Sequence, residues 1–343
     1  MKIFKMKAYV LHGVNELRYD DVKKPECPSG WAVVKVKAAG ICSSDIARIF
    51  TKGTYHFPTI PGHEFSGIVE SVGNDADSSM IGKHVGVFPL IPCRQCPQCA
   101  KKHYEMCTDY DYVGSRRDGG FAEYVVVPVW NLIELPESIS FSSAAMLEPL
   151  AVALHAIKLG DVKKGDNVAI IGTGMIGISA GQWAYKFGAN TVTVIGRNET
   201  KRTLVEKCGL QYKICVNKEE IGEYDFVLEA VGSPQSVELA ISGARPGGTV
   251  LLMGNPFSDI NLVQNLYWRI LRKQLVLKGT WNSSYDGINT SDWTEAVDAL
   301  ANTEINVETL ISHSLKQEEL VKGLELMRDH NEPYCKVITT WND

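Results

Sequence analysis

Two patterns of hydrophobic and polar positions divide the chain. Up to about residue 127 the apolar runs are short and broken by Gly and Pro, and segments 31–38 and 67–73 are typical of strands in an irregular antiparallel barrel. After residue 165, short apolar runs alternate with segments of helical spacing. These runs, at 167–171, 191–195, 226–230, 249–253 and 275–279, predict the buried strands of a parallel doubly wound α/β sheet.

The segments between and after these regions are helical in pattern. Residues 141–159 carry helical spacing, although Pro149 must begin a new helix or kink an existing one. The tail from residue 292 is also helical and ends in a strand-like run at 336–340. We therefore expect one domain from 1–152 and 287–343, with an inserted lobe at 88–112, and a second domain at 153–286.

Composition and charge restrict the class of protein. The chain has 343 residues, of which 45% are hydrophobic and 22% charged, as in ordinary globular proteins. A net charge of -5 does not favour a nucleic-acid or membrane partner. Residues 1–10 lack the apolar core of a signal peptide, and no run approaches the roughly 20 apolar residues of a membrane span. We expect a cytoplasmic, reduced protein.

Four cysteines lie within fifteen residues, in the spacing C-x2-C-x2-C-x7-C: Cys93, Cys96, Cys99 and Cys107. Four thiolates at such spacing can surround one structural Zn²⁺ tetrahedrally. An iron–sulfur cluster also takes four cysteines and is a minor alternative. Disulfides are disfavoured because the chain is long and its cysteine total of 9 is odd. The spacing therefore predicts a structural zinc site.

A glycine motif follows the first predicted parallel strand. Gly172, Gly174 and Gly177 form G-x-G-x-x-G, with Met175 and Ile176 opening the next helix. The first glycine permits a tight turn, the second lets the backbone approach a pyrophosphate, and the third lets helix and strand pack closely. The helix N-terminus adds unpaired N–H groups for the phosphates. This context predicts a dinucleotide site.

The end of the second parallel strand indicates which dinucleotide binds. An NAD site places Asp or Glu there to bind the ribose 2′-hydroxyl, about 20 residues after the glycines. Here the chain has Gly196 followed by Arg197. Glycine leaves room for a 2′-phosphate and a guanidinium can bind it, so we expect NADP(H) to be favoured over NAD(H).

A second set of metal-binding residue types is dispersed along the chain. Gly40-Ile-Cys42-Ser-Ser-Asp45 and Gly62-His63-Glu64 are marked by glycine, and Glu148 precedes a proline. Cys, His and carboxylate side chains bind catalytic zinc, which keeps one position open. With the four cysteines and the glycine motif, these segments resemble the zinc-dependent medium-chain dehydrogenase/reductase family over essentially the whole chain. The Glu-Pro pair resembles its polyol (sorbitol) dehydrogenase branch.

The resemblance implies a GroES-like β-barrel catalytic domain, a Rossmann domain, and reversible conversion of an alcohol to a ketone or aldehyde. Residue by residue, Cys42, His63 and Glu148 match the ligands of a catalytic zinc, which gives two zinc ions per chain with the four-cysteine site. Glu64 matches a carboxylate that can approach the metal. Asp45 matches a partner that orients His63.

The proton path differs from that of simple alcohol dehydrogenases in this family. Ser44 matches the hydroxyl that contacts the bound alcohol and begins removal of its proton. The family's relay ends at a histidine five residues after the cysteine, where this chain has Ala47. The relay must therefore end differently here, and a route through water and Glu64 is one interpretation.

The resemblance also bears on the substrate. Segments 88–93, 112–124 and 279–282 are similar to those of a family member that acts on galactitol 1-phosphate, which favours a phosphorylated sugar alcohol. An unphosphorylated polyol or a secondary alcohol is the alternative. The charged side chains considered for substrate contact, each of which more often is a solvated surface charge, are Arg48, Lys52, Arg116 and Arg117. The aromatic side chains considered for the pocket wall, each equally compatible with a plain core position, are Tyr55, Phe57 and Trp281.

Two other classes of protein remain as alternatives. A zinc-bearing nucleic-acid binder built on residues 93–107 is disfavoured by the negative charge and the complete nucleotide motif. A non-catalytic NADPH sensor would hold one zinc and show no turnover. The resemblance further implies a homodimer or homotetramer, assembled through an edge strand near 275–279.

Overall fold

The computed structural model describes residues 4–287 and 291–341, which form two compact units. Unit 1 comprises Met1–Glu148, Ser284–Asn302 and Ile311–Asp343, and unit 2 comprises Pro149–Ser283 and Thr303–Leu310. The sequence analysis places the domain boundaries after residues 152 and 286, and these boundaries remain a prediction. Residues 1–3, 288–290 and 342–343 of the predicted first domain lie outside the described residues.

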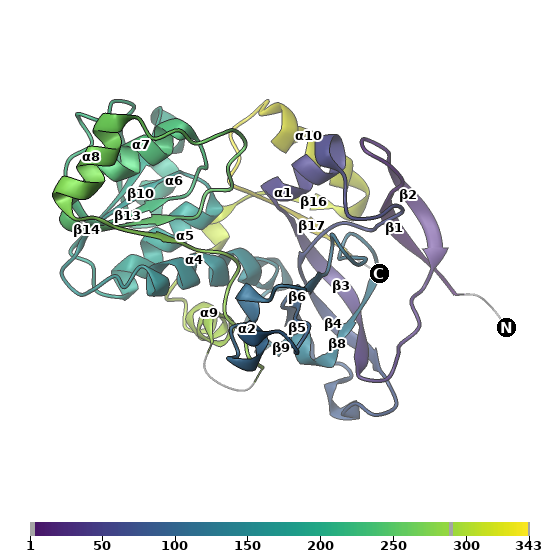
Figure 1. The fold of residues 1–343 in the computed structure, drawn as a ribbon. Coiled ribbons are helices and arrows are strands. Elements are labelled where there is room, and N and C mark those ends of the chain that lie inside the picture. The colour runs from purple at the N-terminus through teal and green to yellow at the C-terminus, as the bar shows by residue number, and fades with distance from the viewer. Residues whose placement is uncertain (1–3, 288–290, 342–343) are drawn as a thin grey trace. The chain divides into compact units, whose positions relative to one another are not determined.

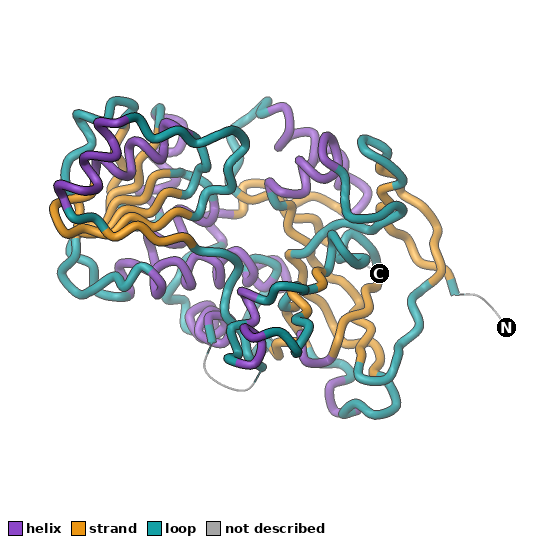
Figure 2. The backbone as a smooth tube through the Cα atoms, in the orientation of Figure 1, coloured by secondary structure: helices purple, strands orange, loops and turns teal. Residues whose placement is uncertain are grey.

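A seven-stranded sheet is the main feature of unit 1 (Figure 2). Its order is β16-β17-β3-β4-β5-β9, with β8 also paired to β3, and all pairs are antiparallel except β16 with β17. The strands are β3 (Trp31–Ile41), β4 (Glu64–Val72), β5 (His84–Val87), β8 (Tyr124–Pro128), β9 (Leu132–Glu134), β16 (Ile311–Lys316) and β17 (Lys336–Thr340).

Smaller elements complete unit 1. Two further antiparallel pairs join β1 to β2 and β6 to β7. The bounds of these strands and of the helices are β1 (Lys5–Leu11), β2 (Leu17–Lys23), β6 (Leu90–Ile91), β7 (Asp111–Tyr112), α1 (Ser43–Ala47), α2 (Pro97–Ala100), α3 (Phe141–Ala144), α9 (Asp292–Ala301) and α10 (Leu320–Asp329). A π-helical turn, η1 (Arg48–Lys52), continues directly from α1.

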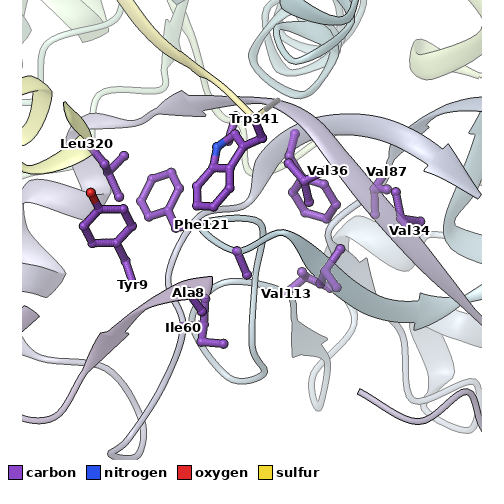
Figure 3. Packing of buried hydrophobic residues seen from close by; sticks show 14 of the residues in the cluster. Ala8, Tyr9, Val34, Val36, Ile60, Val87, Val113, Phe121, Leu320 and Trp341 are labelled. Atoms are coloured by element: carbon purple, nitrogen blue, oxygen red, sulfur yellow. The ribbon is translucent and has the colours of Figure 1, made fainter. Parts of the chain in front are cut away.

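The core of unit 1 is built from alternate positions of its strands. Val34 and Val36 of β3 point to the same face and belong to one buried cluster with Phe121 and Trp341; Val34 lies beside Val87 in it (Figure 3). Leu320, the first residue of α10, joins this cluster and is fully buried. Burial of these side chains fixes the register of the sheet, because a shift of one residue would turn each of them outward.

Unit 2 contains a parallel six-stranded sheet in the order β12-β11-β10-β13-β14-β15. Helices α7 and α8 lie on one face and α5 on the other (Figure 1). The elements are α4 (Leu147–Leu159, which starts in unit 1), β10 (Asn167–Ile171), α5 (Met175–Lys186), β11 (Thr191–Gly196), α6 (Arg202–Lys207), β12 (Gln211–Ile214), β13 (Tyr224–Glu229), α7 (Pro234–Gly243), β14 (Ala244–Leu252), α8 (Gln264–Lys273) and β15 (Val276–Gly279). This is the doubly wound arrangement that the alternating pattern predicts.

The helical predictions need two refinements. Pro149 lies in the first turn of α4, where the missing N–H of proline breaks no helical hydrogen bond, so it marks a new helix and not a kink. The tail is less helical than predicted, because β16 follows α9 and pairs in parallel with β17. Within residues 4–287 and 291–341, no helix has the length and apolar character needed to span a membrane.

Candidate active site

Three predicted metal-site side chains meet where β3 ends and β4 begins. One ligand atom each from Cys42, His63 and Glu64 lies within 4.8 Å of the others. Gly40 of β3 pairs with Glu64 of β4, so the sheet register brings the cysteine turn to the histidine. Gly62 precedes them at φ +95°, and a Cβ there would lie 2.6 Å from the ring of Phe121. Glycine is therefore required at this turn.

Asp45 organises the first turn of α1. Its Oδ2 accepts a hydrogen bond from the backbone N–H of Cys42 at 3.0 Å, and its Oδ1 lies 3.4 Å from His63 Nδ1. Burial alone would raise the pKa of Asp45, but the His63 ring and the Arg48 guanidinium outweigh burial and lower it. The carboxylate thus faces Nδ1 and leaves Nε2 of His63 to bind a metal.

Ser44 stands between Cys42 and Arg48. Its hydroxyl donates to Cys42 Sγ at 3.2 Å and accepts from Arg48 Nη1 at 2.8 Å. Ala47 offers no polar side chain in this turn. The predicted contact residue Ser44 therefore lies beside the predicted zinc ligand.

Glu148 lies next to the three-residue group but not within it. Its pKa is raised to about 7, first by burial and then by the Glu64 carboxylate, while His63 and Lys336 oppose the rise. A bound cation would favour its ionised form. Tyr112, which the sequence analysis did not single out, donates to Glu148 Oε1 at 3.4 Å and has its ring 5.8 Å from that of His63. The part of Glu148 as a zinc ligand remains a prediction.

Lys336 is a second residue that the sequence analysis missed. It is 3% exposed, forms an ion pair with the 2%-exposed Glu64, and donates to the backbone oxygen of Ile41 at 3.1 Å. Burial lowers the pKa of Lys336, but the negative charges of Glu64 and Cys42 raise it more. The only signal in the sequence is a lysine at the start of the apolar run at 336–340, which did not reveal its partner.

The four cysteines of the inserted lobe converge as predicted. Their Sγ atoms all lie within 4.8 Å of one another, and the Cys93–Cys99 and Cys96–Cys107 pairs are each 3.9 Å apart. A zinc–sulfur bond of about 2.3 Å in a tetrahedron places sulfurs about 3.8 Å apart, so this group fits zinc.

Backbone donors favour the thiolate form of Cys96, whereas burial raises the pKa of Cys99 and Cys107, which a bound metal ion would have to overcome. Cys99 N donates to Cys96 Sγ, and Cys93 N donates to Cys107 Sγ. Backbone N–H groups of Cys99 and Thr108 lower the pKa of Cys96 to about 5. None of the nine cysteines forms a disulfide, in agreement with a metal-binding group.

The glycine motif lies between β10 and α5 as predicted. Gly172 has φ +126°, and a Cβ on Gly177 would lie 2.2 Å from the Gly172 oxygen, so neither position tolerates a side chain. A Cβ on Gly174, the N-cap of α5, would meet no atom within 4 Å. The backbone at the start of α5, which includes Met175 and Ile176, is therefore open to a phosphate group.

A close contact with Tyr212 gives a structural reason for glycine at position 196, in addition to the predicted need to leave room for a 2′-phosphate. The phenol oxygen of Tyr212 would lie 1.9 Å from a Cβ at this position, and it donates to the backbone oxygen of Asn198 at 2.5 Å. Any side chain at 196, including a carboxylate, would displace Tyr212. Arg197 is exposed beside it.

The side chains predicted to contact substrate fall in different surroundings. The Arg116 guanidinium lies 4.4 Å from the ring centres of both Tyr55 and Tyr110. Arg48, the first residue of η1, donates to Ser44 of the preceding helix α1. Arg117 pairs with Asp111, and Lys52 and Trp281 are exposed. Tyr55 and Phe57 are exposed too.

Two family descriptions match the chain. Residues 28–137 match the alcohol dehydrogenase GroES-like domain, and residues 176–302 match the zinc-binding dehydrogenase family. The chain is 37% identical over 290 residues to galactitol 1-phosphate 5-dehydrogenase from Escherichia coli strain K12, which covers 82% of this chain and 84% of that protein.

Solved structures share the fold. The galactitol-1-phosphate dehydrogenase from Escherichia coli has a TM-score of 0.91 and 34% identity, over 98% of this chain and 100% of its own. A zinc-binding dehydrogenase from Sinorhizobium meliloti 1021, bound to NADP, has a TM-score of 0.87 and 29% identity, over 98% and 99%. A protein described as a short chain alcohol dehydrogenase from Escherichia coli CFT073, bound to NADH, has a TM-score of 0.89 and 26% identity, over 98% and 99%.

Proposed function

The chain belongs to the zinc-dependent medium-chain dehydrogenase/reductase family, in its polyol dehydrogenase branch, and we propose that it transfers a hydride between NADP(H) and a phosphorylated sugar alcohol. The family matches confirm the predicted oxidoreductase class and the GroES-like plus Rossmann fold class. The observation that carries the proposal is the meeting of Cys42, His63 and Glu64 beside the Ser44 hydroxyl.

These residues suit a catalytic metal. When bound, zinc would supply a Lewis acid for the substrate oxygen and NADP(H) would supply the hydride chemistry. Cys42 and His63 would hold the ion, with Glu148 as the proposed third ligand. Asp45 keeps the His63 ring in orientation, and Lys336 neutralises the charge of Glu64.

We propose a second, structural zinc in the four-cysteine lobe. The group Cys93, Cys96, Cys99 and Cys107 offers four sulfurs and no open position, as a structural site requires. The lobe has the four-residue helix α2, a three-residue 3-10 turn at Tyr104–Met106 and two-residue strands, so a metal would hold together a segment with little core of its own.

The NADP(H) preference is supported by the end of β11. No carboxylate is present where an NAD site would place one, and Arg197 is exposed next to Gly196. Relatives of this fold are known with NADP and with NADH, so the fold permits either cofactor.

Arg116 is our candidate for binding a substrate phosphate. Its guanidinium is held over the Tyr55 and Tyr110 rings, and its Nη1 donates to the Tyr110 backbone oxygen at 2.5 Å. A guanidinium held in this way loses little conformational freedom when it binds an anion. Lys52 and Trp281 are secondary candidates on the surface.

We also propose that copies of the chain associate through β15, as a dimer or tetramer. β15 ends the order of the parallel sheet, and Val276 and Leu277 are exposed on it. Tyr267, Trp268 and Leu271 of α8 are exposed as well. An edge strand with one free backbone edge and exposed apolar side chains is a ready surface for a second copy.

The experiment that tests the proposed function measures NADPH oxidation by the zinc-loaded protein against matched ketoses and ketose phosphates. We expect kcat/KM to be larger for the phosphates. Equal values for both sets would favour an unphosphorylated polyol, and no turnover with any member would contradict the proposal.

A further inference from the structure

Arg48 and Ser44 form a hydrogen-bonded pair next to Cys42. Arg48 Nη1 donates to Ser44 Oγ at 2.8 Å and also lies 3.3 Å from Asp45 Oδ1. The Asp45 side chain is 0% exposed and that of Arg48 is 25% exposed, so the guanidinium reaches inward from the surface. The buried carboxylate therefore holds Arg48 in position behind the Ser44 hydroxyl.

The chemistry of the two side chains fixes the direction of these hydrogen bonds. A guanidinium can only donate, and it does not lose its proton in proteins. A serine hydroxyl has one proton and two acceptor lone pairs. Because Arg48 donates to the Ser44 oxygen, the Ser44 proton must point elsewhere, and in the structure it is donated to Cys42 Sγ. A chain that ends at Arg48 cannot carry a proton away from Ser44.

We infer that Arg48 is a positioning residue: by donating to Ser44 Oγ it leaves the single Ser44 proton free to turn from Cys42 Sγ to the reacting oxygen of the bound substrate. This inference rests on the proposed dehydrogenase function. Ser44 keeps its own proton and stabilises negative charge on that oxygen, and the hydroxyl proton of the alcohol passes directly to water. A donor backed by a positive charge is stronger than an isolated hydroxyl, which suits it to an oxyanion.

The effect of substituting Arg48 on kcat and KM distinguishes this positioning role from binding of a substrate phosphate. If Arg48 acts through Ser44, Arg48→Ala lowers kcat about tenfold to a hundredfold, changes KM little, and does so equally for a ketose and its phosphate. Arg48→Lys, which keeps a positive donor, recovers part of kcat. Loss of phosphate binding would instead raise KM for the phosphate alone. Arg18→Ala, an exposed arginine in the same unit, is the matched control.

The coupling between the two residues can be measured directly. Ser44→Ala and the double variant Ser44→Ala/Arg48→Ala are compared with Arg48→Ala in a double-mutant cycle. We expect the double variant to be no slower than Ser44→Ala, because Arg48 has nothing to act on without the hydroxyl. Circular dichroism and zinc content establish that each variant is folded and loaded.

A binding measurement makes the test independent of turnover. Trifluoroethanol, an alcohol that resists oxidation, is titrated into zinc-loaded protein with NADP⁺ by calorimetry. We expect Arg48→Ala and Ser44→Ala each to weaken its binding about tenfold, the size of one hydrogen bond to a charged group. Additive kinetic effects, an effect on phosphates alone, or unchanged trifluoroethanol affinity would each overturn the inference. Absence of turnover in the wild type would contradict the proposed function, and the trifluoroethanol result would still decide the role of Arg48.

Discussion

Lys336 of β17 and Glu64 of β4 form a buried ion pair beside the proposed catalytic metal site. The two strands are not neighbours, since β3 lies between them in the sheet. The lysine side chain therefore passes the end of β3, where it also bonds to the Ile41 backbone oxygen. A Cβ on Gly40 would lie 2.7 Å from Glu64 Oε2, so this glycine makes room for the pair.

We predict that Lys336→Met destabilises the protein by about 3 kcal/mol, because it leaves the Glu64 carboxylate buried without a partner. The additional change Glu64→Gln should restore much of the loss by removing the unpaired charge. Urea unfolding of the three proteins measures this. Lys322→Met, at an exposed lysine, is the control. Equal stability of Lys336→Met and the wild type would contradict a structural role for the pair.

We predict two zinc ions per chain and different effects of losing each. Cys99→Ser should remove the ion of the four-cysteine lobe and lower the melting temperature by about 10 °C, because binding energy at such sites is folding energy. Metal content and thermal unfolding check the result, with Cys208→Ser as the control outside both groups. A metal content of two in Cys99→Ser would count against the assignment.

We predict that Arg197→Ala raises the KM for NADPH about tenfold and leaves the KM for NADH nearly unchanged, since only NADPH carries the 2′-phosphate. Lys207→Ala, at an exposed lysine in α6, is the control. The measurement is a pair of apparent KM values for each protein. A wild type that prefers NADH would refute the NADP(H) assignment.

We predict a pH-dependent contribution of Asp225 to the stability of the protein. Burial would raise the pKa of Asp225, but the Asn167 backbone N–H and the Arg245 side chain outweigh it and lower the pKa. The charged form is thus favoured in the folded state, so its contribution is present above pH about 4 and is lost as the pH falls through the lowered pKa.

Asp225→Asn should accordingly cost about 1 kcal/mol at pH 7, and the difference from the wild type should shrink as the pH falls below about 4. Urea unfolding from pH 7 to pH 3 measures this, with the exposed Asp259→Asn as control. A difference that does not change with pH would show that the charge of Asp225 is not its cause.

Local patterns in the sequence were sufficient to predict many of the strands and two of the proposed binding sites. The run at 336–340 coincides with β17 and that at 167–171 with β10, because short runs rich in β-branched and apolar residues are typical of strands buried on both faces. The four-cysteine site could be predicted because all four metal-binding side chains are close together in the sequence. The glycine motif was found for the same reason, and the geometry of Gly172 and Gly177 agrees with the tight turn and the close helix packing expected of them, while the role of Gly174 toward a pyrophosphate stays a prediction.

Contacts between residues far apart in the sequence could not be predicted from those local patterns. The partner of Lys336 lies 272 residues away, and Tyr112 meets Glu148 across 36 residues, so neither contact leaves a local signal. The sequence analysis considered Arg48 for binding substrate, but its hydrogen bonds to Ser44 and Asp45 depend on side-chain direction at the junction of α1 and η1. Strand β16 was missed because its polar residues alternate on an exposed edge of the sheet.

The central claim is that Cys42 and His63 hold the metal on which hydride transfer depends. Its most direct test is the rate of ketose phosphate reduction by NADPH with Cys42→Ser, in protein whose fold and four-cysteine zinc are shown to be retained. We predict one zinc per chain and a rate lower by a factor of about 1000 or more. Turnover equal to that of the wild type, with one zinc remaining, would contradict the account.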